Sequence, residues 1–335
     1  MKKRLIFITS PILIAVAVYF LGHAPSTPVF NKSMPAVPQE APALQQFVLN
    51  NEAKHKIKPN NEARIVWADS TNRKTPYSIV YLHGFSASQE EGSPIHTDFA
   101  KTFGCNLYLA RLADHGIDTT EQLLNYTPDR LWATTKEALA IGKAIGEKVI
   151  VMSTSTGGTV ALMLAAEYPD DVSALINMSP NIAINDPNAW LLNNPWGLQI
   201  ARLVVGSNYR TFPKDSLKDA YWNNPYRLES VVQLEELVED TMTPKTFKKV
   251  TCPVLTLYYF KNEKEQDPTV KVSAMIEMNK QLTTPNSMKK TVAIPNAGGH
   301  VLGSHVVSKD LTSVKNEIEK FAIETLEMQK VSRIQ

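Results

Sequence analysis

The chain has 335 residues, of which 43% are apolar and 20% are charged. This length is ample for one large α/β domain with a sizeable core, or for two smaller domains, and the composition excludes a disordered protein. The formal charge of +2 includes Lys2, Lys3 and Arg4, so the rest of the chain carries −1. A surface that binds nucleic acid is therefore not predicted.

The N-terminus carries a targeting signal. Its three basic residues precede Leu5 to Leu21, a run without charged side chains, which is typical of a secretory signal peptide or of a single membrane anchor. We assign residues 1–24 to this segment and expect an extracytoplasmic protein, either periplasmic or secreted, or one tethered to a membrane. Gly22 and Ala24 suit a cleavage site, whereas Pro25 opposes cleavage, so both outcomes stay open.

Residues 25–60 form a second segment. Five prolines lie between Pro25 and Pro42, which predicts an extended tether or a segment that wraps the domain surface. A short helix is expected within residues 43–55.

Apolar runs rich in β-branched residues then alternate with helix-forming runs over residues 61–180 and 250–330. This alternation predicts an α/β fold whose mostly parallel, doubly wound sheet has helices on both faces. The expected strands are 64–68, 77–82, 106–110, 149–152, 172–178, 254–259 and 288–294. The expected helices are 96–103, 129–145, 156–168, 270–282 and 309–328.

The alternation is interrupted over residues 181–249, which are rich in Trp, Tyr, Asn and Pro. A segment of this length is far longer than an ordinary connection, so it predicts an inserted cap with a small core of its own. One amphipathic helix is expected around Leu234 and Leu237.

The stretch from Lys148 to Tyr168 predicts a strand, an abrupt turn and a helix, with Ser155 at the turn. A serine at the apex of such a turn needs small residues two positions away on either side, here Ser153 and Gly157, because larger side chains would collide. The pattern also fits an ordinary Ser/Thr/Gly turn or an anion-binding helix start.

A serine nucleophile needs a base, and the base needs an orienting carboxylate. Both are expected in loops at the carboxyl ends of later strands. His300 follows two glycines in the loop after residues 288–294, although a loop histidine can also simply bind a backbone carbonyl; His305 is a weaker candidate. Asp267 follows residues 254–259 and is also placed to cap the next helix. The alternative acids are Glu263, Glu265 and Asp186.

The order Ser155, Asp267, His300 resembles the α/β-hydrolase superfamily, in which the catalytic triad follows strands five, seven and eight. The resemblance covers about residues 63–328. It is closest to the cap-bearing lipase and esterase branch, which includes monoglyceride lipases and serine aminopeptidase-like hydrolases. Residues 81–88 (Tyr-Leu-His-Gly-Phe-Ser-Ala-Ser), together with residues 111–116 and 153–159, are similar to a group of uncharacterised bacterial hydrolases.

This resemblance implies the α/β-hydrolase fold with a helical cap inserted after strand six. It also implies that the N–H groups of Phe85 and Thr156 form the oxyanion hole, and that His83 is a structural loop residue. The chain departs from the family pattern at Ser153 and at Asp114, where glycine is usual.

We therefore expect a serine hydrolase that cleaves a carboxylic ester through an acyl-enzyme on Ser155. The apolar and aromatic cap favours a small-molecule ester with an apolar acyl or aromatic group. An amidase, peptidase or acyltransferase with the same triad is an alternative, as is a catalytically silent, ligand-binding member of the fold. No metal or cofactor is expected, and Cys105 and Cys252 are expected to be free thiols.

Overall fold

The computed structural model describes residues 13–14 and 16–331. Its centre is a seven-stranded sheet in the order β1-β3-β2-β4-β5-β8-β11. Strand β1 runs antiparallel to β3, and every other neighbouring pair is parallel, which confirms the predicted mostly parallel sheet. The strands are β1 (Arg64–Val66), β2 (Thr75–Leu82), β3 (Asn106–Leu109), β4 (Gly146–Thr154), β5 (Val172–Met178), β8 (Val254–Tyr258) and β11 (Lys289–Ala293).

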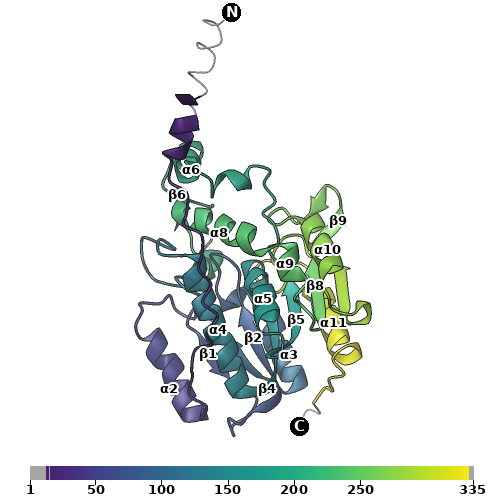
Figure 1. Ribbon diagram of the computed structural model, residues 1–335. Helices are drawn as coiled ribbons and strands as arrows, with labels where there is room; N and C mark the ends of the chain where they lie inside the picture. Colours follow the sequence, from purple (N-terminus) through teal and green to yellow (C-terminus); the bar gives the residue numbers. More distant parts are fainter. Residues whose placement is uncertain (1–12, 15, 332–335) are drawn as a thin grey trace, which may run out of the picture.

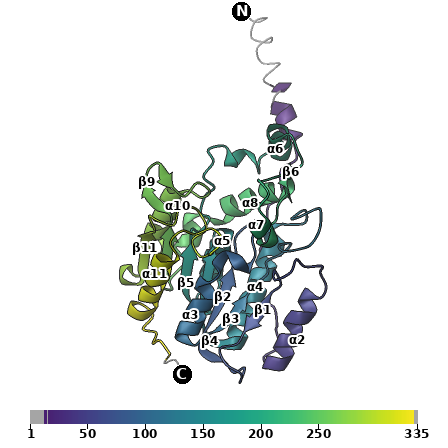
Figure 2. The same cartoon turned by 180° about the vertical axis from the view of Figure 1, so that it is seen from behind.

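Helices cover both faces of this sheet (Figures 1 and 2). Successive strand side chains point to opposite faces, so Val80 and Val151 enter one apolar core and Ile79 and Ile150 enter the other. The first core lies under α4, α5 and α10, and the second lies under α3 and α11. These helices are α3 (Ile95–Phe103), α4 (Pro128–Ile145), α5 (Thr156–Glu167), α10 (Val272–Gln281) and α11 (Leu311–Glu324).

Most element bounds differ from the predicted ones by a few residues, and the local bonding explains two of the differences. Helix α4 begins one residue early, at Pro128, because proline is tolerated in a first turn. Strand β1 ends at Val66 rather than at residue 68. The Ala68 N–H donates to the side-chain Oδ1 of Asn106, 2.8 Å away, instead of continuing the strand ladder.

The insertion between β5 and β8 is the predicted cap. The predicted helix around Leu234 and Leu237 is α8, whose buried side chains pack against α4 and α5. The backbone N–H of Asn223 donates to the carbonyl of Ser86 in the loop after β2, so the cap covers the carboxyl ends of the strands. Its elements are η2 (Ala189–Leu191), α6 (Gly197–Val205), β6 (Tyr209–Arg210), α7 (Ser216–Tyr221), β7 (Tyr226–Arg227), α8 (Leu228–Thr241) and α9 (Pro244–Phe247).

Counting from the strand that precedes Ser155 as strand five, the cap follows strand six, as expected. The remaining elements are short or lie outside the main layers. They are α2 (Ala41–Glu52), η1 (Gln89–Gly92), β9 (Phe260–Asn262), β10 (Glu265–Gln266) and η3 (Asn286–Met288).

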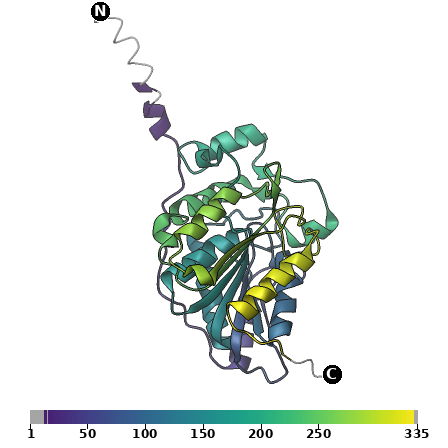
Figure 3. The same cartoon turned by 90° about the vertical axis from the view of Figure 1, so that its right-hand side faces the viewer.

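The proline-rich segment runs along the surface of α4. The Val29 N–H donates to Asp129 Oδ1 (2.7 Å), and Trp132 Nε1 donates to the carbonyl of Asn31 (2.8 Å). Further towards the N-terminus, residues 16–20 are helical and lie beside the cap (Figure 3), where Trp196 Nε1 donates to the carbonyl of Val18.

The predicted run from Leu5 to Leu21 lies partly outside the described residues. Within residues 13–14 and 16–331, no helix has the length and apolar character needed to cross a membrane. Cys105 is buried, Cys252 is half-buried, and both are free thiols.

Candidate active site

Ser155 is the single residue between β4 and α5, and its backbone is strained. Its φ of 53° and ψ of −120° are sparsely populated by residues other than glycine and cost on the order of 1–3 kcal/mol. The Ser155 N–H donates to the carbonyl of Met178 (3.1 Å), and the Ser155 carbonyl accepts from the Asn181 N–H (2.9 Å). The end of β5 and the residues after it therefore hold the turn in this conformation.

The residues two positions before and after Ser155 are small for different physical reasons. A Cβ on Gly157 would lie 2.0 Å from the carbonyl oxygen of Leu82, so a side chain at this position would collide with backbone. Ser153, in contrast, is fully buried and donates its hydroxyl to Oδ1 of Asn177 on β5 (2.8 Å). The hydroxyl is thus accommodated at the position where glycine is usual.

The structure brings Asp267 and His300 together. Nδ1 of His300 donates to Oδ2 of Asp267 at 2.7 Å, while the other carboxylate oxygen accepts the N–H groups of Thr269 (2.8 Å) and Val270 (3.1 Å). Burial acts to raise the pKa of Asp267, but the imidazole and the two N–H groups outweigh it and leave this pKa below its ordinary value. Because α10 begins only at Val272, Asp267 does not cap that helix.

The second ring nitrogen of His300, Nε2, is not the one that bonds Asp267. Nε2 is buried and makes no hydrogen bond within the described part of the chain, so Ser155 Oγ and His300 Nε2 are not bonded in this structure. Burial acts to lower the pKa of His300, but the interaction with Asp267 and a smaller one with Glu91 leave the pKa above its ordinary value. Catalytic hydrogen bonds are often long in the absence of substrate, and an unpartnered buried Nε2 is an acceptor ready for a proton.

The alternative candidates have other partners. His305 Nδ1 lies 3.3 Å from the carbonyl of Ser93. Glu265 is exposed and pairs with Lys261 (2.9 Å), and Asp186 is exposed and accepts the Asn188 N–H. Glu263 is also exposed. None of these side chains is bonded to His300.

The loop after β2 is held by His83. Its Nδ1 donates to the carbonyl of Gly84 (2.9 Å), and its Nε2 accepts the Leu112 N–H (3.1 Å). Burial lowers the pKa of His83 well below its ordinary value, so the ring is neutral and structural. No hydrogen bond occupies the Phe85 N–H within residues 16–331, and Thr156, as the first residue of α5, has no intrahelical acceptor for its N–H. Both groups are thus free to receive a ligand oxygen.

Asp114, the second departure from the family pattern, lies in the loop that His83 contacts. Its φ of 62° is a left-handed conformation that favours glycine and that aspartate tolerates better than most residues. Its carboxylate is paired with Arg130 through two hydrogen bonds of 2.8 and 3.0 Å. The ion pair with Arg130 thus holds Asp114 in place, and this contact does not involve the turn at Ser155.

Glu91 belongs to the site and was not predicted. It lies on η1, is 2% exposed, and its Oε2 accepts the Gly84 N–H at 2.5 Å. Its burial raises the pKa of the carboxyl to about 7. The sequence around Glu91 does not distinguish it from its neighbour Glu90, because only the tertiary fold buries one of the two.

Comparison with known proteins identifies the family. The model of the alpha/beta hydrolase family matches residues 79–308, a span that contains Ser155, Asp267 and His300. The chain belongs to the alpha/beta hydrolase family. The expected fold is therefore confirmed at the level of the family as well as of the sheet.

Solved structures agree with this assignment. A structure from work on the metagenome-derived lipolytic enzymes LipS and LipT has a TM-score of 0.63 at 15% identity, over 79% of this chain and 98% of that one. The monoacylglycerol lipase of Paleococcus ferrophilus gives 0.57 at 12% identity, over 78% and 97%. Est1E from Butyrivibrio proteoclasticus with bound ferulic acid gives 0.54 at 20% identity, over 79% and 95%. At these identities the likeness concerns the fold, and no curated protein matches the chain.

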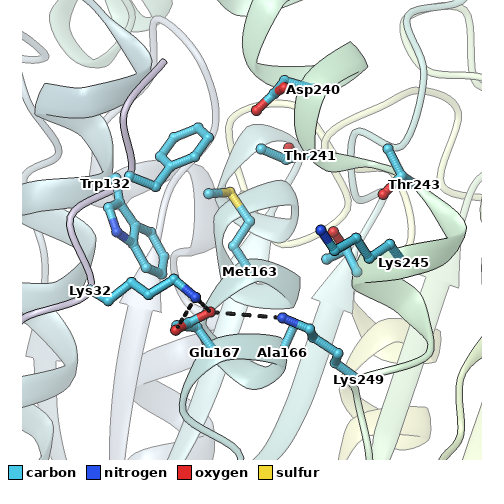
Figure 4. Close-up of a pocket in the computed structure, with 12 residues that line it drawn as sticks. Lys32, Trp132, Met163, Ala166, Glu167, Asp240, Thr241, Thr243, Lys245 and Lys249 are labelled. Carbon is cyan, nitrogen blue, oxygen red and sulfur yellow. Dashed lines mark hydrogen bonds and ion pairs between the residues drawn. The ribbon is translucent and has the colours of Figure 1, made fainter. Parts of the chain in front are cut away.

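This alpha/beta hydrolase has a separate pocket far along α5 from Ser155 (Figure 4). Its volume is about 290 Å³, and the proline-rich segment forms one wall. Glu167 lies between Lys32 (2.8 Å) and Lys249 (4.0 Å) at its rim. The triad candidates do not line this pocket. In the described part of the chain, no group of three or more His, Cys, Asp or Glu side chains is placed to hold a metal ion.

Proposed function

We propose that this protein is a serine hydrolase that cleaves a carboxylic ester through an acyl-enzyme on Ser155. In this proposal His300 is the general base and then the general acid, and Asp267 fixes the tautomer of its ring. The N–H groups of Phe85 and Thr156 form the oxyanion hole. The observation that carries the proposal is the Asp267–His300 pair of 2.7 Å, in which the buried Nε2 of His300 has no partner among the described residues.

In the acylation half-reaction, Ser155 Oγ attacks the ester carbonyl carbon while its proton moves to Nε2 of His300. The carbonyl oxygen becomes an anion that the N–H groups of Phe85 and Thr156 bind, and each such donor typically stabilises the transition state by about 3 kcal/mol. When the intermediate collapses, the carbon–oxygen bond of the leaving alcohol breaks and His300 returns the proton to that alcohol. The acyl group stays on Ser155.

Deacylation repeats these steps with water. A water molecule attacks the acyl carbon and gives its proton to His300, and the Ser155 oxygen then leaves and takes the proton back. The carboxylic acid is released. The negative charge of Asp267 stabilises the imidazolium that forms in both half-reactions.

The residues near the oxyanion loop support a substrate with an apolar acyl or aromatic group. The ring of Phe85 packs edge-on against Tyr126 (5.3 Å between centroids) and against Tyr226 of the cap (5.2 Å). Aromatic side chains therefore pack beside the loop that would hold the carbonyl oxygen, and apolar and aromatic surroundings are usual for sites that bind apolar small molecules.

An active-site-directed fluorophosphonate tests the nucleophile. We expect the wild type to be labelled and Ser155→Ala to remain unlabelled, with both proteins unfolding at the same temperature. Labelling that persists in Ser155→Ala would assign the nucleophile to another serine. Absence of labelling in a folded wild type would favour the alternative of a silent, ligand-binding member of the fold.

The type of bond cleaved needs its own experiment. Wild type and His300→Ala should be compared on p-nitrophenyl esters of short and medium acyl chains and on aminoacyl amides. The ester proposal requires turnover of the esters that is lost in His300→Ala. Turnover of the amides alone would replace it by an amidase or peptidase, and transfer of the acyl group to an added alcohol in preference to water would indicate an acyltransferase.

We further propose an extracytoplasmic location, periplasmic or secreted, or a membrane tether through Leu5 to Leu21. The support is the sequence pattern of three basic residues followed by an uncharged apolar run. Expression of the full chain, followed by fractionation and N-terminal sequencing of the mature protein, tests this. A full-length chain in the soluble cytoplasmic fraction would contradict both forms of the proposal.

A further inference from the structure

The buried carboxylate of Glu91 joins two parts of the site that the triad leaves separate. Its Oε2 accepts the N–H of Gly84, the residue directly before the expected oxyanion donor Phe85. Since Gly84 and Phe85 share a peptide bond, fixing the Gly84 N–H limits the orientation of the Phe85 N–H. Glu91 thus holds the oxyanion loop through the N–H of Gly84, whereas His83 bonds the carbonyl of the same residue.

Glu91 also lies close to the proposed nucleophile. A Cβ built on Gly84 would be 2.8 Å from Cβ of Ser155 and 2.9 and 3.0 Å from the two carboxylate oxygens of Glu91. The nearer oxygen and Ser155 Cβ are therefore no further apart than 2.8 Å plus 2.9 Å. The same distances disfavour any side chain at Gly84, because its Cβ would collide with both Ser155 and Glu91.

Besides Gly84 and Ser155, Glu91 interacts with His300, the proposed general base. The negative charge of Glu91 acts on His300 in addition to that of Asp267, and the imidazole acts on Glu91 in return. Other groups face η1 from the elements packed against it. They are Tyr81 of β2, His96 of α3, His305, whose Nδ1 lies 3.5 Å from Glu90, and Trp222, whose indole stabilises the charged form of Glu91. Helix α7 also packs against η1 and carries Lys218 and Asp219.

We propose that Glu91 is a positioning residue for catalysis, which fixes the oxyanion loop through Gly84 and adds a second negative charge to the environment of the His300 imidazole. This inference rests on the hydrolase function proposed above.

The proposal assigns two separable roles to one side chain. Glutamine in place of Glu91 keeps a carbonyl oxygen for the Gly84 N–H but removes the charge, whereas alanine removes both. Because the charges of Glu91 and His300 act on each other, the protonation of one group changes the titration of the other. A carboxylate that only filled space would leave the titration of His300 unchanged when replaced by the isosteric amide.

The test is an NMR titration of the His300 ring in wild type, Glu91→Gln and Glu90→Gln, with the His300 signal assigned from His300→Gln. Glu90 is a matched control, because it is the adjacent acid on the same short helix and contacts Gln89 and His305 rather than Gly84. We expect the His300 titration to move to lower pH by about one unit in Glu91→Gln and by much less in Glu90→Gln, since removing a nearby negative charge disfavours the imidazolium. This readout needs no substrate, so it is independent of the hydrolase proposal.

Ester hydrolysis supplies the second readout. The acid limb of kcat/KM in Glu91→Gln should move to lower pH in step with the titration, with kcat at the optimum within about tenfold of wild type. In Glu91→Ala, kcat should fall by about 10²-fold or more, because the oxyanion loop loses its anchor.

Two results would overturn the inference. The first is a His300 titration and a pH profile that coincide in wild type and Glu91→Gln, and the second is equal kcat in Glu91→Ala and Glu91→Gln. A shifted titration in a protein that hydrolyses no ester would retain the charge role of Glu91 and refute the hydrolase proposal instead.

Discussion

The strand-end loops and the cap above them are held by different kinds of interaction. Ser155 and Asp267 are fixed by backbone hydrogen bonds to β5 and to the loop before α10. The cap packs on the core through the apolar side chains of α8, and its outer part is held in addition by ion pairs, Arg202 with Glu229 within the cap (2.7 Å) and Arg227 with Glu121 below it (2.6 Å). Backbone bonds in a buried sheet persist at all salt concentrations, whereas partly exposed ion pairs contribute about 0–1 kcal/mol and are screened.

The two regions also differ in the apolar surface that they expose. Ser155 and Asp267 are 7% and 0% exposed, whereas Leu203 and Val204 on α6 are 83% and 79% exposed. We therefore infer that the sheet edge holds the proposed reacting groups and that the cap tolerates change. Substitutions in the loops should therefore change kcat or folding, and substitutions in the cap should change mainly KM.

The largest effect is expected from Ser155→Ala. Removal of the hydroxyl removes the covalent route, and kcat on a reactive ester should fall by about 10⁴-fold or more, because the remaining groups act only through binding and the oxyanion hole. The free energy of unfolding should change little, since alanine leaves the backbone bonds of residue 155 in place. Steady-state kinetics and urea unfolding measure the two quantities, and a residual kcat within tenfold of wild type would contradict the assignment.

Asp267→Asn should follow, with a loss in kcat of about 10³–10⁴-fold. The amide retains an oxygen for the N–H groups of Thr269 and Val270, but it no longer fixes the Nδ1–H tautomer of His300 or stabilises the imidazolium. Glu265→Gln, in the exposed β9–β10 pair, is the matched control and should leave kcat unchanged. Equal losses in the two variants would show that Asp267 is not the orienting acid.

Gly157→Ala tests the packing of the turn itself. The added methyl group would lie 2.0 Å from the carbonyl oxygen of Leu82, so β2 or α5 must shift. We expect a destabilisation of about 3 kcal/mol in urea unfolding, together with a loss of activity. Gly299→Ala is the control, because a Cβ at Gly299 meets no atom within 4 Å, and its free energy of unfolding should stay within about 0.5 kcal/mol of wild type.

The sequence was sufficient for the sheet, because strand alternation is a property of the chain, and for placing Asp267 and His300 in loops that meet. The catalytic roles of Ser155, Asp267 and His300 stay predictions. It was not sufficient for Glu91. Glu90 and Glu91 are adjacent and chemically identical, and only the packing of η1 against Gly84 and the cap buries the second. The exposed apolar side chains of α6 were likewise unpredictable, because their periodicity is that of an ordinary buried helix face.

Glu91 makes the stability of the loops depend on pH. Its folded-state pKa of about 7 lies above the ordinary value of 4.5, so between these values the native state binds more protons than the unfolded state. The free energy of unfolding should therefore fall as pH rises from 5 to 8, by up to roughly 3 kcal/mol from this group. Urea unfolding of wild type and Glu91→Gln at both pH values measures the effect, and the variant should show a smaller fall. Parallel pH dependences would refute the burial of an ionisable Glu91.

The smallest effect is expected in the cap, at Arg227→Gln. Arg227 bonds Glu121 of the core and Glu229 of α8, so its loss weakens the link between the β6–β7 pair and the loop beneath it, while the bond from the residue 227 N–H to the carbonyl of Gln122 remains. We expect at most about 1 kcal/mol of destabilisation, because these pairs are partly exposed. KM should rise a few-fold, and kcat should be unchanged, if the cap binds the substrate and the sheet edge holds the reacting groups as proposed. Lys280→Gln breaks an exposed pair with Glu277 on α10 and should alter none of these quantities. If Arg227→Gln lowered kcat with KM constant, the cap would have to set the geometry of the reacting groups, and the division between a fixed sheet edge and an adjustable cap would be wrong.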